Sequence, residues 1–199
     1  MPTQTPESEA TIEDVKAKKE PQYIYKKDPK FVEVARIAYP EAEIPQGHQT
    51  ENKYNFHAGL FQFKTTDFDV LQVSIDRVRE FAYRSYYKPL KLEKIADQDV
   101  QVGAAVLRMF TCWPNSEAVV AVQNVCIAFG LRIADESRIE PDGIWSEHTF
   151  GAAVDAAKKH GDRFVWALEA EEYHLLRVRA GGDKKVFEPL IHGKIKGVW

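Results

Sequence analysis

The stretch QDVQVGAAVLRMFTCWPNSEAVVAVQNVCIAFG, residues 98–130, decides the fold. Its apolar side chains recur at three- and four-residue intervals, which is the spacing of a buried helical face. The break Pro114-Asn115-Ser116 divides the stretch, because proline does not continue a helix. Gly130 ends it, since glycine readily adopts the conformation that closes a helix. The pattern therefore predicts two consecutive apolar helices.

The flanking residues set the expected bounds of these two helices. Asp97 is a suitable N-cap, so the first helix is expected from about Gln98 to Cys112. The second is expected to run from the break to Phe129. Cys112 and Cys126 both fall in these apolar patterns, which favours two reduced thiols in the core. A disulfide between neighbouring helices is the alternative.

Helical patterns continue on both sides of this stretch. On the N-terminal side, helices are expected at about 31–40, where a proline ends the run, and at about 70–87. On the C-terminal side, they are expected at 146–160 and 162–180, each beginning at a capping residue. Strand signals are weak and allow at most a short hairpin within 41–63. The expected fold class is therefore all-α.

The apolar faces of the expected helices predict the hydrophobic core. Each face repeats apolar side chains at helical spacing, and such a face is buried against neighbouring helices. The expected core members are Phe31, Val34, Ile37, Val78, Phe81, Val102, Ala105, Val106, Met109, Val122, Val125, Ile127, Val154, Phe164, Leu168 and Leu175.

Composition limits the class of protein. The chain has 199 residues, enough for one domain or one domain with a small appendage. Its net charge of -3 and pI of about 6.1 argue against a dedicated nucleic-acid binder, which usually carries a basic stripe. It contains no run of about 18 apolar residues, so no membrane span is expected.

The N-terminal residues 1–29 have the composition of a polar arm. These residues lack the charged segment followed by an apolar one that marks a secretory signal peptide. No such peptide is therefore expected, and synthesis is expected to be cytoplasmic. A polar segment of this kind buries too little surface to fold alone. The only apolar cluster in the arm, Tyr23-Ile24-Tyr25, is its expected anchor, either on the chain's own core or on a partner.

Motifs for metals and nucleotides are missing from the sequence. The six histidines form no HExxH or other close ligand pair, and neither a P-loop nor GxGxxG nor GxSxG occurs. We therefore expect no metal and no cofactor.

Two carboxylates follow the first expected helix. Glu41 and Glu43 precede a segment rich in side-chain amides, including Asn52 and Asn55, and then the apolar run Gly59-Leu60-Phe61-Gln62. A carboxyl group beside apolar side chains can have a raised pKa and act as a general acid toward a glycosidic oxygen. Amide side chains suit sugar hydroxyls. The alternative is that both carboxylates are simply solvated.

A second group of residues, Asp142-Gly143-Ile144-Trp145-Ser146-Glu147-His148-Thr149, predicts a tight turn followed by a helix with Ser146 near its N-cap. One interpretation is that the turn docks the last two helices on the core. The other is that Trp145 offers an aromatic platform to a sugar or a peptide stem.

These residues also carry a resemblance to a known family. Asp-Gly-Ile-Trp-Ser-x-x-Thr, followed by an alanine-rich helix, resembles the DGxxGxxT motif of small helical peptidoglycan-binding segments, with Ser146 at the second glycine. Tyr86-Tyr87-Lys88-Pro89-Leu90 resembles the YW-x-P-L stretch of phage-type N-acetylmuramidases, glycoside hydrolase family 108. The resemblance covers about residues 31–180. It implies a lysozyme-like helical domain at 30–130, a peptidoglycan-binding-like helical segment at 131–199, and an arm at 1–29.

The same resemblance implies the site residues. Glu41 falls on the catalytic glutamate of the family's Glu-Gly-Gly-Tyr motif, while Ala42 and Glu43 stand at the two glycines. A second alignment, to the Glu…GLMQ pattern of lytic transglycosylases, makes Glu43 the acid and includes Gln62. For a muramidase with Glu41 as acid, Asn52 and Asn55 are polar candidates to orient water or an N-acetyl group, and Trp145 is the candidate platform for substrate.

Three functions remain open on these grounds. The first is a muramidase that cleaves peptidoglycan at the cell wall. The second is a catalytically degenerate muramidase-like component of a phage or phage-derived assembly, joined through residues 1–29 within a virion-like particle. The third is a glycan-binding module without catalysis. Peptidoglycan is the expected partner, and nucleic acid is not.

Overall fold

The computed structural model describes residues 22–39, 74–131, 139–179 and 181. Within these ranges every regular element is helical, which confirms the all-α class. The lysozyme-like character of the domain stays a prediction. The elements are a 3₁₀ turn η1 (Ile24–Lys27), α1 (Pro29–Ala38), α2 (Ile75–Ala82), a π-helical turn η2 (Tyr83–Tyr87), α3 (Leu92–Gln98), α4 (Val100–Cys112), α5 (Asn115–Ala128), α6 (Glu147–His160) and α7 (Asp162–Arg179).

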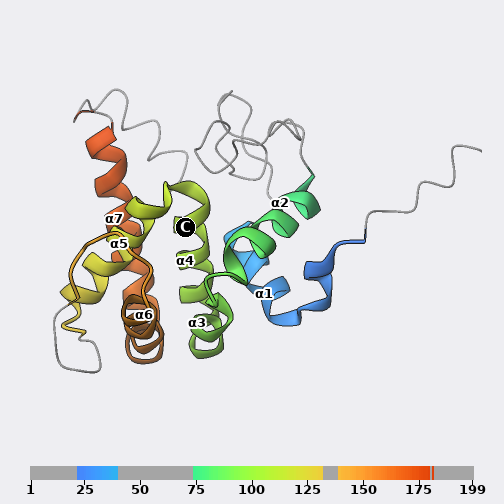
Figure 1. Ribbon diagram of the computed structural model, residues 1–199, viewed down its shortest axis with the longest axis horizontal. Coiled ribbons are helices and arrows are strands. Elements are labelled where there is room, and N and C mark those ends of the chain that lie inside the picture. Colours follow the sequence, from blue (N-terminus) through green and yellow to red (C-terminus); the bar gives the residue numbers. More distant parts are fainter. Residues whose placement is uncertain (1–21, 40–73, 132–138, 180, 182–199) are drawn as a thin grey trace, which may run out of the picture.

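Helix α4 lies in the middle of the molecule (Figure 1). It packs against α1, α3, η2, α5 and α7, so elements from both halves of the chain meet on it. Its residues are apolar nearly all round, as expected of a helix enclosed by neighbours. Helices on both sides of residue 130 share one core cluster. The division into an arm and two segments stays a prediction.

The start of α4 corrects one expectation. Asp99, and not Asp97, is the N-cap: its carboxylate accepts hydrogen bonds from the N–H groups of Gln101 and Val102 at 2.8 and 3.1 Å. Residues 92–98 form the separate helix α3, which the sequence pattern did not predict. Gly103 lets α3 and α4 approach closely, because a Cβ there would lie 2.7 Å from the Cβ of Ala96.

Most of the expected core is buried, with two clear exceptions. Ile37 and Ile127 are 36% and 38% exposed. Ile37 directly precedes a buried residue, and Ile127 directly follows one. One step along a helix turns a side chain by about 100°, which takes it away from the buried face. Three further members are only half-buried: Phe81, Val154 and Leu175.

The helix expected at 70–87 is interrupted. Within the described residues, α2 begins at Ile75, and its N-cap Ser74 accepts a hydrogen bond from the Arg77 N–H at 3.3 Å. From Tyr83 the chain continues as the π-helical turn η2, which buries Tyr86 and Tyr87. Irregular turns of this kind are not visible in the periodicity of a sequence.

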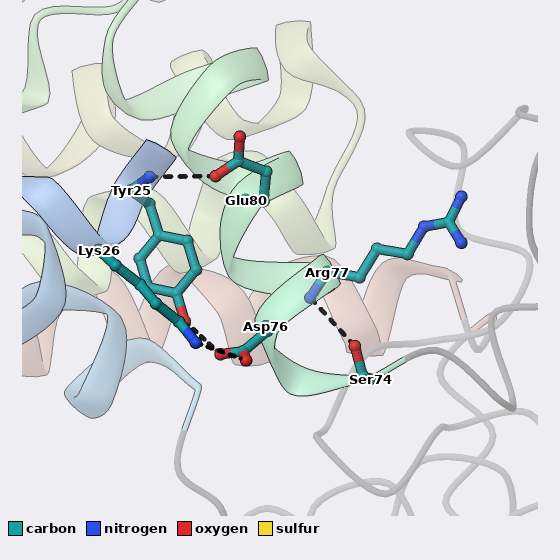
Figure 2. Close-up of polar contacts among 6 residues, drawn as sticks. All are labelled: Tyr25, Lys26, Ser74, Asp76, Arg77 and Glu80. Carbon is teal, nitrogen blue, oxygen red and sulfur yellow. Dashed lines mark hydrogen bonds and ion pairs between the residues drawn. The ribbon is translucent and has the colours of Figure 1, made fainter. Parts of the chain in front are cut away.

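The apolar cluster of the N-terminal arm packs partly on the core. Tyr25 is 3% exposed, its hydroxyl donates to the Asp76 carboxylate, and its N–H donates to Glu80 Oε2 at 3.0 Å (Figure 2). Lys26 forms an ion pair with Asp76 at 2.8 Å. Ile24 is 45% exposed. Residues 22–28 thus connect α1 to α2, while residues 1–21 lie outside the described ranges.

The C-terminal helices begin and end as expected. Ser146 is the N-cap of α6, and its hydroxyl accepts from the Thr149 N–H at 3.2 Å. Gly161, with φ of +44°, separates α6 from α7. Among the described helices, none is both long and apolar enough to span a bilayer.

Candidate functional site

Five of the six predicted site residues lie outside the described ranges. They are Glu41, Glu43, Asn52, Asn55 and Gln62. Their roles stay predictions. The sixth, Trp145, is described, as is Tyr39, two residues before Glu41 in the sequence.

The C-terminal end of α1 is held by two other helices. Tyr39 is 2% exposed, and its hydroxyl donates to Thr111 Oγ1 on α4 at 3.1 Å. Its carbonyl accepts a hydrogen bond from Arg79 Nη2 on α2 at 3.0 Å. Burial raises the pKa of Tyr39, so its hydroxyl stays protonated and available as a donor. Tyr39 is therefore held by α4 through its side chain and by α2 through its backbone carbonyl.

A partly buried ion pair lies one helical turn from Thr111. Arg108 on α4 is 3.4 Å from Glu172 and 3.6 Å from Glu169, both on α7. The Trp113 indole N–H also donates to Glu172 at 3.3 Å. Glu172 is only 4% exposed, and a guanidinium and an indole N–H are the partners that a buried carboxylate requires. This arrangement joins α4 to α7.

Gln123 organises the Asp-Gly turn before α6. Its side-chain NH₂ donates to Asp142 Oδ1 at 2.7 Å and to Thr149 Oγ1 at 3.0 Å, and its amide oxygen accepts from the Gly143 N–H at 3.0 Å. Gln123 and Thr149 are each 1% exposed. The hydrogen bonds from Gln123 and from the Ile144 N–H hold the pKa of Asp142 below its usual value.

Each residue of the turn that carries the family resemblance therefore has a distinct structural role. Asp142 receives two donors, and Gly143 adopts φ of +73°, a conformation that favours glycine. Ser146 caps α6, and Thr149 is buried under the turn. The predicted helix start with Ser146 at the N-cap is confirmed.

Trp145 packs inward from this turn. Its ring meets Phe110 edge-on, with centroids 5.1 Å apart, and lies 6.4 Å from Phe150. The indole N–H donates to the Leu90 carbonyl at 3.3 Å. The side chain is half-buried against the core, so its visible contacts are those of an anchor between the turn, α4 and the segment before α3. Contact with substrate stays a prediction.

The variant Trp145→Ala distinguishes a structural anchor from a platform that contacts substrate. We expect a loss of about 2 kcal/mol in the free energy of unfolding, below the roughly 3–5 kcal/mol of a fully buried aromatic residue. Thermal melting measures it, with Ile144→Ala as the control, because Ile144 is 61% exposed in the same turn and its truncation costs little. A variant that melts like the parent but binds glycan weakly would make Trp145 a platform and not an anchor.

Four residues that sequence analysis missed shape this region: Gln123, Arg108, Glu172 and Tyr39. Each acts through a partner on another helix, so no local motif marks it. In the described ranges no group of three His, Cys, Asp or Glu side chains is placed to hold a metal ion.

Comparisons with protein-family models, with curated proteins and with solved structures find no match to this chain.

Proposed function

We propose that the protein cleaves the glycan strands of peptidoglycan as an N-acetylmuramidase, with Glu41 as the general acid. The observation that carries the proposal is the turn at Asp142–Thr149. Its residues resemble the peptidoglycan-binding motif, and its Asp, Gly, Ser and Thr each have a separate role in one hydrogen-bonded structure. The turn thus has the hydrogen-bonded structure that these residue types predict.

A second line of support comes from the end of α1. In the family that the sequence resembles, the catalytic glutamate follows the first helix. Glu41 likewise follows α1 in this sequence. Tyr39 is anchored by Arg79 and Thr111, which gives the chain a rigid starting point two residues earlier. A catalytic group benefits from such support, because small displacements of an acid are costly in rate.

In the proposed reaction the Glu41 carboxyl group donates its proton to the oxygen of the glycosidic bond. The bond breaks as positive charge develops on the sugar ring in an oxocarbenium-like transition state. Water then completes hydrolysis, and the glutamate is reprotonated. Asn52 and Asn55 are proposed to orient the water or the N-acetyl group, and Gln62 to contact the substrate.

Glu41→Gln tests the assignment of the acid. The substitution keeps the size of the side chain and removes its transferable proton, so we expect clearing of purified peptidoglycan to slow at least about 100-fold. Glu33→Gln is the matched control, because Glu33 is an exposed glutamate on α1, and it should clear like the parent.

Glu43→Gln decides between the two alignments. If Glu43→Gln loses activity while Glu41→Gln clears as fast as the parent, the transglycosylase-like alignment is correct and Glu43 is the acid. If neither substitution slows an active parent, the general-acid role belongs to another residue.

A further inference from the structure

Arg79 on α2 contacts both ends of the segment 22–39. At the C-terminal end of this segment, its Nη2 donates to the Tyr39 carbonyl at 3.0 Å. Toward the N-terminal end, it hydrogen-bonds the hydroxyl of Tyr25 in η1. The side chain is only 8% exposed, and a buried guanidinium requires such partners because its charge is costly to remove from water. A single side chain thus connects η1 with the C-cap of α1.

The Tyr25 hydroxyl is shared between Arg79 and Asp76. It donates to the Asp76 carboxylate, which the Lys26 ammonium also contacts (Figure 2). Burial and Asp76 raise the pKa of Tyr25 to about 12, although Arg79 opposes part of this rise. The hydroxyl is therefore protonated at neutral pH, where it donates to Asp76 and accepts from Arg79.

Asp76 holds this end of the arrangement by its charge. Partial burial raises the pKa of Asp76, but the hydrogen bonds from Lys26 and Tyr25 and the charge of Arg79 together keep it below its usual value. The carboxylate is thus ionised at neutral pH. It attracts the guanidinium as well as the hydroxyl, so the docking of η1 and the place of Arg79 depend on the same group.

Tyr39 is the residue through which the contact reaches the end of α1. Its N–H donates to the Ala35 carbonyl at 2.9 Å, and its own carbonyl accepts from Arg79. The N–H groups of a guanidinium have fixed directions in one plane, so its two hydrogen bonds set its orientation together. Loss of the Tyr25 contact therefore lets the guanidinium tilt, which weakens its bond to the Tyr39 carbonyl.

We propose that Arg79 couples the docking of η1 to the position of the Tyr39 backbone, so that Tyr25 and Arg79 are positioning residues for the carboxylate that follows α1. The assignment of that carboxylate to Glu41, which lies outside the described residues, rests on the proposed function. The coupling itself does not, because all of its contacts lie within the described residues. Undocking of η1 from α2 then lowers activity without any change in the residues that touch substrate.

Hydrogen exchange at the Tyr39 amide of the full chain tests the coupling without requiring cleavage. This N–H is bonded to the Ala35 carbonyl, so its exchange rate measures local opening at the end of α1. Tyr25→Phe keeps the ring and removes the hydroxyl that Arg79 contacts. We expect the Tyr39 amide to exchange about 5-fold faster in this variant, which is the scale of coupling between residues of one hydrogen-bond network.

Tyr83→Phe is the matched control. Its hydroxyl also donates to a carboxylate, that of Asp28, at 3.4 Å, and its ring contacts the same Phe31 ring as Tyr25. The contacts of its hydroxyl do not include Arg79, so the Tyr39 amide should exchange as in the parent. The inference is overturned if Tyr25→Phe leaves this exchange rate unchanged, or if Tyr83→Phe raises it equally.

Arg79→Lys tests whether the coupling passes through the guanidinium. A single ammonium group lacks the planar fork that reaches two partners, so Tyr25→Phe should produce no further increase at Tyr39 in this background. An equal increase in both backgrounds would show that the effect bypasses Arg79, and the inference would be wrong. The comparison of Tyr25→Phe with Tyr83→Phe needs no Arg79 variant and decides by itself whether the two ends are coupled.

Kinetics separate the positioning role from the proposed reaction. If the parent releases reducing ends from peptidoglycan, Tyr25→Phe should lower kcat about 5-fold at unchanged KM, whereas Tyr83→Phe should keep both values. An unchanged kcat in Tyr25→Phe refutes the positioning role. A parent that releases no reducing ends, but shows faster exchange at Tyr39 in Tyr25→Phe alone, keeps the coupling and refutes the hydrolase.

Discussion

Gln123→Leu is expected to lower the free energy of unfolding by about 3 kcal/mol, because it leaves buried hydrogen-bonding groups without their partner. The Gly143 N–H loses its acceptor, and Thr149, itself 1% exposed, loses a donor at 3.0 Å. Leucine fills the volume of glutamine but restores neither bond. For a chain of this length we expect a fall in Tm of about 10 °C, measured by thermal unfolding.

Asn124→Leu is the control for this prediction. Asn124 is the next residue on α5, and its amide donates a long hydrogen bond, 3.4 Å, to Glu171 on α7. It is half-buried, so its replacement should cost less than about 1 kcal/mol. If the two variants melt at the same temperature, the network around Gln123 does not stabilise the turn, and the main structural support for the motif is lost.

Phe31→Ala is expected to have an effect of similar size or larger, about 3–5 kcal/mol. Phe31 is fully buried on α1, and its ring contacts the rings of Tyr25, Tyr83 and Tyr87 with centroids 5.6, 4.9 and 4.8 Å away. It therefore connects η1, α1 and η2. Truncation leaves a cavity among three aromatic rings that cannot easily collapse.

Chemical denaturation measures the loss for Phe31→Ala. Val32→Ala provides the comparison, because Val32 is the adjacent, half-buried residue of the same helix and should lose only about 1 kcal/mol. A Phe31→Ala variant as stable as Val32→Ala would mean that η1 and η2 do not depend on α1. Residues 22–28 would then not belong to the cooperative fold.

The helices that sequence predicted best have clear local boundaries. Pro114 and Gly161 stop or start a helix through their backbone, and Ser146 starts one through its side-chain hydroxyl, so neighbouring residues suffice to place them. The predicted start of α4 was wrong, because Asp97 and Asp99 are equally suitable N-caps when only the neighbouring residues are considered. The choice between them is made by tertiary packing, which buries Ile95 and Ala96 and so keeps α3 as a separate helix.

The contacts around the candidate site could not be read from sequence for a similar reason. Gln123 finds its partners 19 and 26 residues away, and Arg108 pairs with Glu172 across 64 residues. No local periodicity or motif predicts contacts between residues so far apart in the sequence. Ser146, whose partner Thr149 is three residues on, was predicted correctly. The tryptophans show the same limit. Trp145 is half-buried and Trp166 is exposed, and this difference in exposure depends on the fold.

The most direct measurement of the central claim is the chemistry of the products released from purified peptidoglycan by the parent protein. Mass spectrometry of the soluble fragments distinguishes strands that end in reducing N-acetylmuramic acid from strands that end in the anhydro sugar. A hydrolase with Glu41 as acid predicts reducing N-acetylmuramic acid ends, and their disappearance in Glu41→Gln. Intact glycan strands after incubation with the parent, or anhydro ends in place of reducing ends, would contradict it.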